Sequence, residues 1–292
     1  MIYRLASSCL LLLFTVLFAS AEENSSVPVI LTAGQSNADG RVPLAQLPGE
    51  LQTYNYCQWS YGSGDYETAT GQFSPFRPRT AKPNVTDRWG FDAMVYHLLE
   101  QYWQRPFYVI KQTDGGTAID PSCKDSTHGL YWSADTAFLS STTSASHGGK
   151  SLLKAFTRQI DDCLLHLPAN YEIKVLIWHQ GESDQKACEH YYDNLKAVVA
   201  YLRHYLVEKT GRQQYAHLPV VCGTYSLLSK ARAQKVVDAL ERLAQEDANF
   251  YVVDASTLSI QRDKLHFDAS GAAVLGKRYF DMMLQHGILD ER

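Results

Sequence analysis

The sequence predicts an α/β protein, a three-layer α/β/α sandwich around a five-stranded, mainly parallel sheet. One observation is a set of short, near-continuous apolar runs rich in β-branched residues. The other is that segments with apolar residues every three or four positions lie between these runs. Runs that are apolar throughout indicate strands buried on both faces, as in a parallel sheet. Strands that alternate with helices indicate a sandwich in which helices cover the sheet.

The elements follow one another in a regular order. The expected strands are VPVILTA (27–33), PFYVIKQ (106–112), IKVLIWH (173–179), LPVVCGT (218–224) and NFYVVDA (249–255). The expected helices carry apolar stripes over residues 91–102, 152–164, 195–206, 236–243 and 273–283. No repeat of fixed period and no linker-like composition interrupts them, so we expect a single domain over residues 22–292.

Two long segments break this order, residues 41–89 and residues 113–149. The first is rich in aromatic residues, and the second is rich in Gly, Ser and Thr and contains Trp132. Loops this long within a compact domain are often functional, although they can also be surface additions. We expect both segments to be loops that form the side of a pocket that receives the substrate.

The composition excludes several classes of protein. The 292 residues are 45% hydrophobic and 20% charged, which is typical of globular domains and excludes disordered, collagenous and coiled-coil chains. Lys and Arg number 27 against 31 Asp and Glu, a net charge of −4. This balance offers no basic excess for nucleic acid, so no nucleic-acid partner is expected.

The N-terminus resembles a secretory signal peptide. Arg4 precedes an apolar stretch over residues 5–18, which is too short to span a bilayer comfortably. Ala19-Ser20-Ala21 fits a signal peptidase site, so we expect a signal peptide over residues 1–21 and cleavage before Glu22. An uncleaved anchor is the alternative. With cleavage, the mature protein is expected to be secreted or periplasmic, with no membrane attachment.

Five cysteines remain after cleavage. Cys163 lies on a helical apolar stripe and Cys222 in an apolar strand, so both are expected in the core. Cys57 and Cys123 fall in the expected loops and form the best candidate disulfide in an exported protein. Two N-glycosylation sequons begin at Asn24 and Asn84 and matter only in a eukaryotic source.

Polar residues follow the expected strands at the point where each strand ends. In an open parallel sheet, ligands bind beyond the carboxyl ends of the strands. Ser36 follows the first strand and opens the next element, where its own N–H can help to hold the oxyanion that a nucleophile creates. A serine at such a place is also often only a helix N-cap. Gly115 and Gly116 follow the second strand, where a backbone N–H can approach a ligand closely, or where they form only a tight turn.

The third strand is followed by six polar or small residues, HQGESD (179–184). Gln180 offers a side-chain N–H, and Glu182 can orient its neighbours. Before the last helix come Asp263 and His266, spaced so that the carboxylate can hold the imidazole in one tautomer as a general base. His179 is the rival base.

The order of these residues, with Ser first and Asp and His last, resembles that of the SGNH or GDSL-like hydrolases. The blocks Gly-Gln-Ser-Asn, Gly-Gly-Thr, His-Gln-Gly-Glu-Ser-Asp and Asp-x-x-His-Phe resemble the sialate O-acetylesterase and carbohydrate esterase family 6 branch, over most of the mature chain. The resemblance implies a flavodoxin-like SGNH fold and removal of O-acetyl groups from a carbohydrate, with no metal and no other cofactor. Acetylated xylan and O-acetylated sialic acid both fit the family.

The resemblance also implies the roles of individual residues. It makes Ser36 the nucleophile, with Asp263 and His266 completing a triad. The oxyanion hole would use the N–H of Ser36, the N–H of Gly115 (favoured over Gly116) and the side-chain amide of Gln180. The residues expected to support the site are Gln35, Asn37, Gly116, His179 and Glu182.

Other functions remain open at this point. An SGNH lipase or thioesterase would share the scaffold, as would a non-catalytic glycan-binding protein. A metal hydrolase is disfavoured because the sequence has no H-E-x-x-H motif. A P-loop is disfavoured because Ser144 stands where the first glycine of a motif ending in Gly149-Lys150-Ser151 would fall.

Overall fold

The computed structural model describes residues 26–62, 71–78 and 88–289. The expected signal peptide and both sequons lie outside these ranges.

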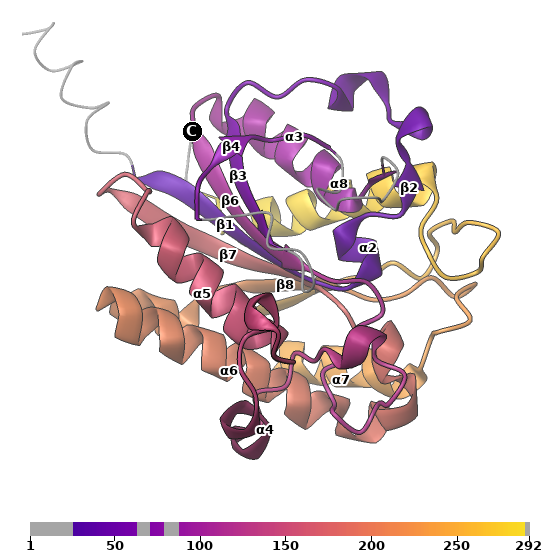
Figure 1. Ribbon diagram of the computed structural model, residues 1–292. Coiled ribbons are helices and arrows are strands. Elements are labelled where there is room, and N and C mark those ends of the chain that lie inside the picture. The colour runs from indigo at the N-terminus through magenta and orange to yellow at the C-terminus, as the bar shows by residue number, and fades with distance from the viewer. Residues whose placement is uncertain (1–25, 63–70, 79–87, 290–292) are drawn as a thin grey trace, which may run out of the picture.

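The described residues form one large sheet and helices on both of its faces (Figure 1). The strands are β1 (Val27–Gly34), β2 (Val42–Pro43), β3 (Cys57–Gly62), β4 (Ser74–Pro75), β5 (Arg88–Trp89), β6 (Phe107–Thr113), β7 (Tyr171–His179), β8 (Val220–Gly223) and β9 (Phe250–Val253). The α-helices are α2 (Ser36–Asp39), α3 (Phe91–Trp103), α4 (Thr136–Ser141), α5 (Leu152–Leu164), α6 (Tyr191–Thr210), α7 (Gln234–Glu246) and α8 (Ala269–Gln285).

The large sheet has the strand order β4-β3-β6-β1-β7-β8-β9, and only β4 runs antiparallel to its neighbour. Helices α3 and α8 pack together on one face, and α5, α6 and α7 cover the other. The α/β/α sandwich and all five expected strands are therefore confirmed, as are the five expected helices. The central strands are buried on both faces, which is why their sequences are largely apolar.

The strand count was underestimated, because the large sheet has seven strands rather than five. The two additional strands, β3 and β4, come from the segment that was expected to be a loop. Strand β3 (CQWSYG) mixes polar and aromatic residues and lacks the continuous apolar run of the other strands. Its aromatic rings are nevertheless core residues, since Trp59 and Tyr61 are buried and stack at 5.1 Å.

The second expected loop also contributes to the core. Trp132 is completely buried and packs edge-on against Trp178 of β7, with ring centroids 5.2 Å apart. Its Nε1 donates a hydrogen bond to Thr117 Oγ1 at 3.2 Å. This ring stabilises the fold and does not face a substrate.

The candidate disulfide is wrong, because Cys57 and Cys123 are both free thiols in separate apolar clusters. Cys57 lies on β3 against the layer of α3, and so it is not a loop residue. Cys163 and Cys222 are buried in the core, as expected.

Three central strands end in register. Gly34, the last residue of β1, pairs with Thr113 of β6 on one side and with His179 of β7 on the other. The chain segments that follow these three strands are therefore neighbours at one edge of the sheet. In Figure 1 this edge lies to the right, where α2 follows β1.

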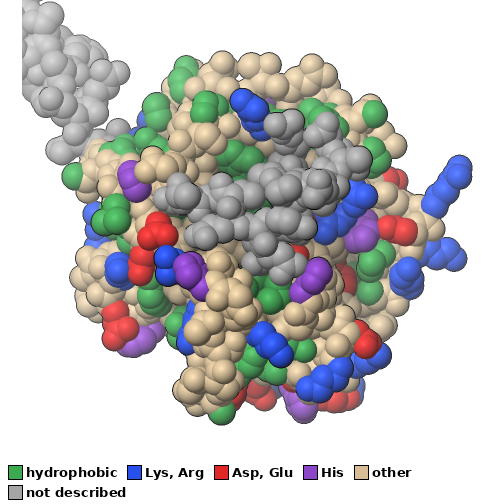
Figure 2. All heavy atoms as spheres, viewed as in Figure 1, with side chains coloured by type: hydrophobic (Ala, Val, Ile, Leu, Met, Phe, Trp, Pro, Cys, Tyr) green, Lys and Arg blue, Asp and Glu red, His purple; other side chains and the backbone are tan. Residues whose placement is uncertain are grey.

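No helix among the described residues is long and apolar enough to cross a membrane. On the face shown in Figure 2, basic and acidic side chains are interspersed, in agreement with the small net charge.

Candidate active site

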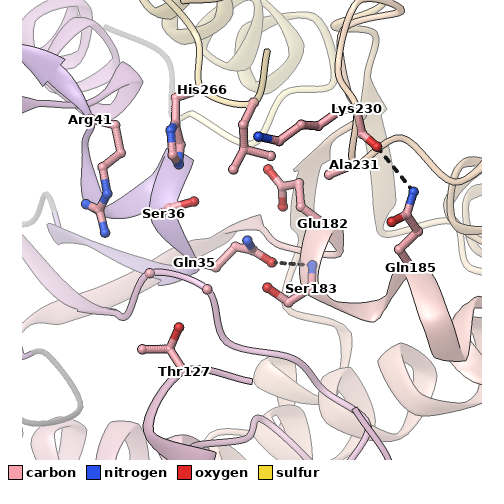
Figure 3. A pocket seen from close by; sticks show the side chains of 13 residues that line it. Gln35, Ser36, Arg41, Thr127, Glu182, Ser183, Gln185, Lys230, Ala231 and His266 are labelled. Carbon is pink, nitrogen blue, oxygen red and sulfur yellow. Dashed lines mark hydrogen bonds between the residues drawn. The ribbon is translucent and has the colours of Figure 1, made fainter. Parts of the chain in front are cut away.

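A pocket of about 580 Å³ lies beyond the carboxyl ends of the parallel strands. Its size falls in the range of small-molecule sites. The lining residues come from the segments after β1, β6, β7, β8 and β9 (Figure 3): Gln35, Ser36, Arg41, Gly115, Gly116, Thr127, Glu182, Ser183, Gln185, Lys230, Ala231, Leu265 and His266.

Ser36 begins α2 at the floor of this pocket and is 5% exposed. The turn before it depends on Gly34, whose φ is +145°. A Cβ at Gly34 would lie 2.1 Å from the carbonyl oxygen of His179, so only glycine lets β1 and β7 approach this closely. The Gln35 N–H then donates to the same carbonyl at 3.0 Å, which fixes the direction in which α2 leaves the sheet.

Asp263 and His266 lie in the segment between β9 and α8. His266 Nδ1 is 2.6 Å from Asp263 Oδ2, and Asp263 Oδ1 accepts the backbone N–H groups of Leu265 and His266 at 2.9 and 3.1 Å. The carboxylate thus holds the ring, and Nε2 is the nitrogen left for the pocket. Figure 3 shows the ring of His266 next to Ser36. The structure therefore brings all three residues of the expected triad to one site.

The environment of His266 affects its proton affinity in two opposing ways. Burial lowers the pKa of His266, because the charged ring loses water, and the hydrogen bond to Asp263 partly offsets this effect. The net pKa lies below the ordinary value, so the ring is neutral and able to act as a base at neutral pH. The same contact holds the pKa of Asp263 below its usual range, against the opposing effect of burial.

Gly115, rather than Gly116, faces the serine. A Cβ at Gly115 would lie 3.4 Å from Ser36 Cβ and 2.0 Å from Arg41 Nη2. A Cβ at Gly116 would instead lie 2.2 Å from Thr127 Oγ1, and the φ of Gly116 is +76°. Gly115 is therefore the glycine at the nucleophile, and Gly116 makes the turn behind it.

His179 lies beneath the site and does not line the pocket. It is completely buried, and its Nδ1 is 3.1 Å from the hydroxyl of Tyr279. Burial lowers the pKa of His179 to about 3, so it stays neutral. This environment fits a structural histidine better than the rival base.

Glu182 does line the pocket, although it is 7% exposed. Its Oε1 accepts a hydrogen bond from Asn37 Nδ2 at 2.8 Å. Burial raises the pKa of Glu182, and the hydrogen bond from Asn37 partly counteracts that effect.

The position of Gln180 does not fit its expected role as the side-chain donor of the oxyanion hole. It is 1% exposed, does not line the pocket, and directs its Nε2 toward Asp184, Thr117 and Gln35 at 2.6, 3.0 and 3.2 Å. Gln35, expected only to support the site, does line the pocket.

Several lining residues belong to no motif in the sequence. Arg41 follows Ser36 by five positions, and this proximity was the only signal for it. Lys230 lies in the segment after β8, in which no motif was found, and its side chain extends across the pocket (Figure 3). Both long segments contribute to the pocket, the first through Arg41 and the second through Gly115, Gly116 and Thr127, although the described lining residues include no Tyr, Trp or Phe. Within the described ranges, no group of three or more His, Cys, Asp or Glu side chains could hold a metal ion.

The fold and the pocket define a class of protein: an α/β/α sandwich that carries a serine and a carboxylate-held histidine beyond the ends of its parallel strands. The chain belongs to a family of carbohydrate esterases, since the family described as "Carbohydrate esterase, sialic acid-specific acetylesterase" matches residues 26–285.

Solved structures share the fold at low sequence identity. A protein from Arabidopsis thaliana has a TM-score of 0.64 at 19% identity, covering 89% of this chain and 99% of its own. NanS has a TM-score of 0.62 at 14% identity, covering 89% and 97%. A carbohydrate acetylesterase from Xanthomonas citri has a TM-score of 0.52 at 15% identity, covering 87% of this chain and 55% of its own. No curated protein matched the sequence.

Proposed function

We propose that this protein is an exported serine esterase that removes O-acetyl groups from carbohydrates. The observation that carries the proposal is the pairing of His266 with Asp263 beside Ser36 in one pocket. Membership of a carbohydrate acetylesterase family supports the reaction class. The signal-like sequence of residues 1–21 supports export.

The reaction proceeds by acyl transfer in two steps. His266 Nε2 takes the proton of Ser36 Oγ as the oxygen attacks the acetyl carbonyl carbon, and the carbonyl electron pair moves onto its oxygen. The N–H groups of Ser36 and Gly115 stabilise that oxyanion. The intermediate collapses, the sugar oxygen leaves with the proton from His266, and water then hydrolyses the acetyl-serine by the same route.

The character of the pocket favours a sugar over a long acyl chain. Only Ala231 and Leu265 among its 13 lining residues contribute a purely aliphatic side chain. A lipase or thioesterase would need an apolar channel for the acyl chain, whereas the polar side chains here suit hydroxyl groups. The cations Arg41 and Lys230 further favour a sugar that carries a carboxylate, such as an O-acetylated sialic acid, over neutral acetylated xylan.

The test is acetate release from 4-nitrophenyl acetate, acetylated xylan and 9-O-acetyl sialosides. We expect release from the sialosides to exceed release from xylan, and Ser36→Ala to abolish both. Ser183→Ala is the matched control, because Ser183 lines the same pocket and is expected to be dispensable for the chemistry. A wild-type protein that releases no acetate from any ester would contradict the proposal, and binding of deacetylated glycans would then support the non-catalytic alternative.

A further inference from the structure

The side chain of Gln35 lies in the wall of the pocket directly before Ser36. We propose that Gln35 Nε2 is the side-chain donor of the oxyanion hole, and that Gln180 acts on it only as a positioning residue. This inference rests on the proposed esterase function and assigns a residue to a role within it.

The orientation of the Gln35 amide is fixed by its neighbours. Its Oε1 accepts hydrogen bonds from the backbone N–H groups of Gly181 and Ser183 and from Gln180 Nε2, each at 3.2 Å. Backbone N–H groups can only donate, so the atom that faces them must be the oxygen. The amide therefore cannot be reversed without losing these hydrogen bonds.

This orientation leaves Gln35 Nε2 on the pocket side. Gln35 is only 2% exposed, and its hydrogen bonds to the described residues all use Oε1 rather than Nε2. Figure 3 shows the oxygen of Gln35 directed toward Ser183 and its nitrogen directed away from it, on the side of Ser36. A buried side-chain amide with a free N–H beside a nucleophile is a pre-oriented donor for a developing negative charge.

The side-chain amide of Gln180 is already hydrogen-bonded to groups outside the pocket. Its Nε2 carries two hydrogens and already faces three acceptors, of which Asp184 Oδ2 at 2.6 Å is the nearest. Its Oε1 accepts from the hydroxyl of Tyr191 at 3.2 Å, which holds the other end of the amide. Gln180 could reach an oxyanion only by breaking these contacts, whereas Gln35 needs to break none.

The chemistry requires no proton transfer from Gln35. As the bond between Ser36 Oγ and the acetyl carbon forms, the carbonyl oxygen gains the electron pair of the broken π bond. Gln35 Nε2 donates a hydrogen bond to that oxygen and keeps its proton throughout. When the intermediate collapses, the electron pair returns to the carbonyl and the hydrogen bond weakens.

The decisive variant is Gln35→Glu, which keeps an oxygen that faces Gly181 and Ser183 and replaces the donor with a carboxylate oxygen that can only accept. We expect a folded protein with kcat on 4-nitrophenyl acetate lower by about 10²- to 10³-fold and a nearly unchanged KM, since one oxyanion-hole donor is lost. Gln104→Glu is the control, because Gln104 lies outside the pocket on the exposed surface, where it donates to the carbonyl of Gln101 at 3.4 Å. We expect that control to stay within about threefold of wild type.

A second measurement separates catalysis from positioning. Methylboronic acid adds to a serine nucleophile as a tetrahedral anion, so its affinity reports on the oxyanion donors. We expect Gln35→Glu, and Gln35→Met if the first variant fails to fold, to bind it about 10²-fold more weakly while KM stays within about threefold.

A folded Gln35→Glu variant with wild-type kcat and boronate affinity would overturn this role and leave the esterase function intact. A wild type without esterase activity, or a fully active Ser36→Ala variant, would instead overturn the proposed function itself.

Discussion

Asn37 Oδ1 accepts a hydrogen bond at 3.2 Å from the backbone N–H of Phe267. These two residues directly follow the proposed nucleophile, Ser36, and the proposed base, His266. The other end of the same amide, Nδ2, donates to Glu182. One buried side chain thus links the segments after β1, β7 and β9 and sets the separation between nucleophile and base.

Replacing Asn37 with alanine is therefore expected to impair both stability and activity. The change leaves the Glu182 carboxylate and the Phe267 N–H without this partner, which costs about 1–3 kcal/mol of unfolding free energy. A small shift of His266 away from Ser36 lowers kcat by about tenfold to hundredfold. Urea denaturation and steady-state kinetics would measure the two effects.

The control for this prediction is Asn194→Ala. Asn194 Nδ2 donates to Asp120 Oδ2 at 3.1 Å, an amide–carboxylate contact outside the pocket. We expect its removal to leave kcat unchanged. An Asn37→Ala variant with wild-type kcat would show that the link does not position the catalytic pair.

The pH dependence should report the balance of effects on His266. Because burial lowers its pKa, the acidic limb of kcat/KM should fall below pH 6.5, with a plateau at neutral pH. Asp263 opposes this lowering, so Asp263→Asn should move the limb to still lower pH. The variant should also lose about 10²- to 10⁴-fold in kcat, because the ring is no longer held in the productive tautomer.

A pH profile of kcat/KM on 4-nitrophenyl acetate for both proteins would check this prediction. A limb above pH 6.5 in the wild type, or a shift upward in Asp263→Asn, would contradict it.

The two glycines after β6 should respond differently to alanine. Gly115→Ala meets side-chain atoms of Arg41 and Ser36 and no backbone atom among its nearest neighbours, so the fold should persist. The new methyl group lies next to Ser36, and we expect kcat/KM to fall about tenfold to hundredfold. Gly116→Ala has a left-handed backbone and a close approach to Thr127, so its main effect should be a loss of about 1–2 kcal/mol in stability.

Thermal melts and kinetics on both glycine variants would separate these effects. Activity lost only in a well-folded Gly116→Ala protein would instead place Gly116, and not Gly115, next to the nucleophile.

The sequence predicted those parts of the fold that have a strong local pattern. The five expected strands are largely apolar because helices cover both faces of the sheet, and the helices show one buried stripe each. Strand β3 escaped prediction because Gln58 and Ser60 interrupt its buried aromatic residues. Strand β4 has only two residues, too few for any pattern.

The sequence also predicted part of the candidate site, because local sequence patterns mark some of its residues. Ser36, Gly115, Asp263 and His266 could be found because short blocks after strands carry them. The roles of Gln35 and Gln180 could not be separated, since they depend on a contact between residues 145 positions apart. Which amide faces the pocket is decided by tertiary hydrogen bonds, to which no sequence pattern corresponds.

A variant of Trp132 tests whether the second long segment, residues 113–149, contributes to the core. Its truncation to alanine should cost about 3–5 kcal/mol of unfolding free energy, as expected for a completely buried ring. Tyr56→Ala is the matched control, because Tyr56 is an aromatic residue of the first segment with 38% of its surface exposed. That control should change stability by less than about 0.5 kcal/mol. Equal and small effects in both variants, measured by urea denaturation, would show that Trp132 is not a core residue.

Arg41 should decide between charged and neutral sugars. Its Nη1 is held by Asp39 at 2.5 Å, and its Nη2 lies over Gly115 at the edge of the oxyanion site. A guanidinium fixed in this way can pair with a substrate carboxylate without further ordering.

We expect Arg41→Gln to raise KM for 9-O-acetyl sialosides by about tenfold, because roughly one charge-assisted hydrogen bond to the substrate is lost. KM for 4-nitrophenyl acetate and acetylated xylan should change by less than about twofold, because neither carries the carboxylate. The comparison is made within one variant, so a lower stability caused by the loss of the ion pair with Asp39 affects all three substrates alike. Equal changes in KM for all three would assign Arg41 a structural role and remove the charge argument for an acidic sugar.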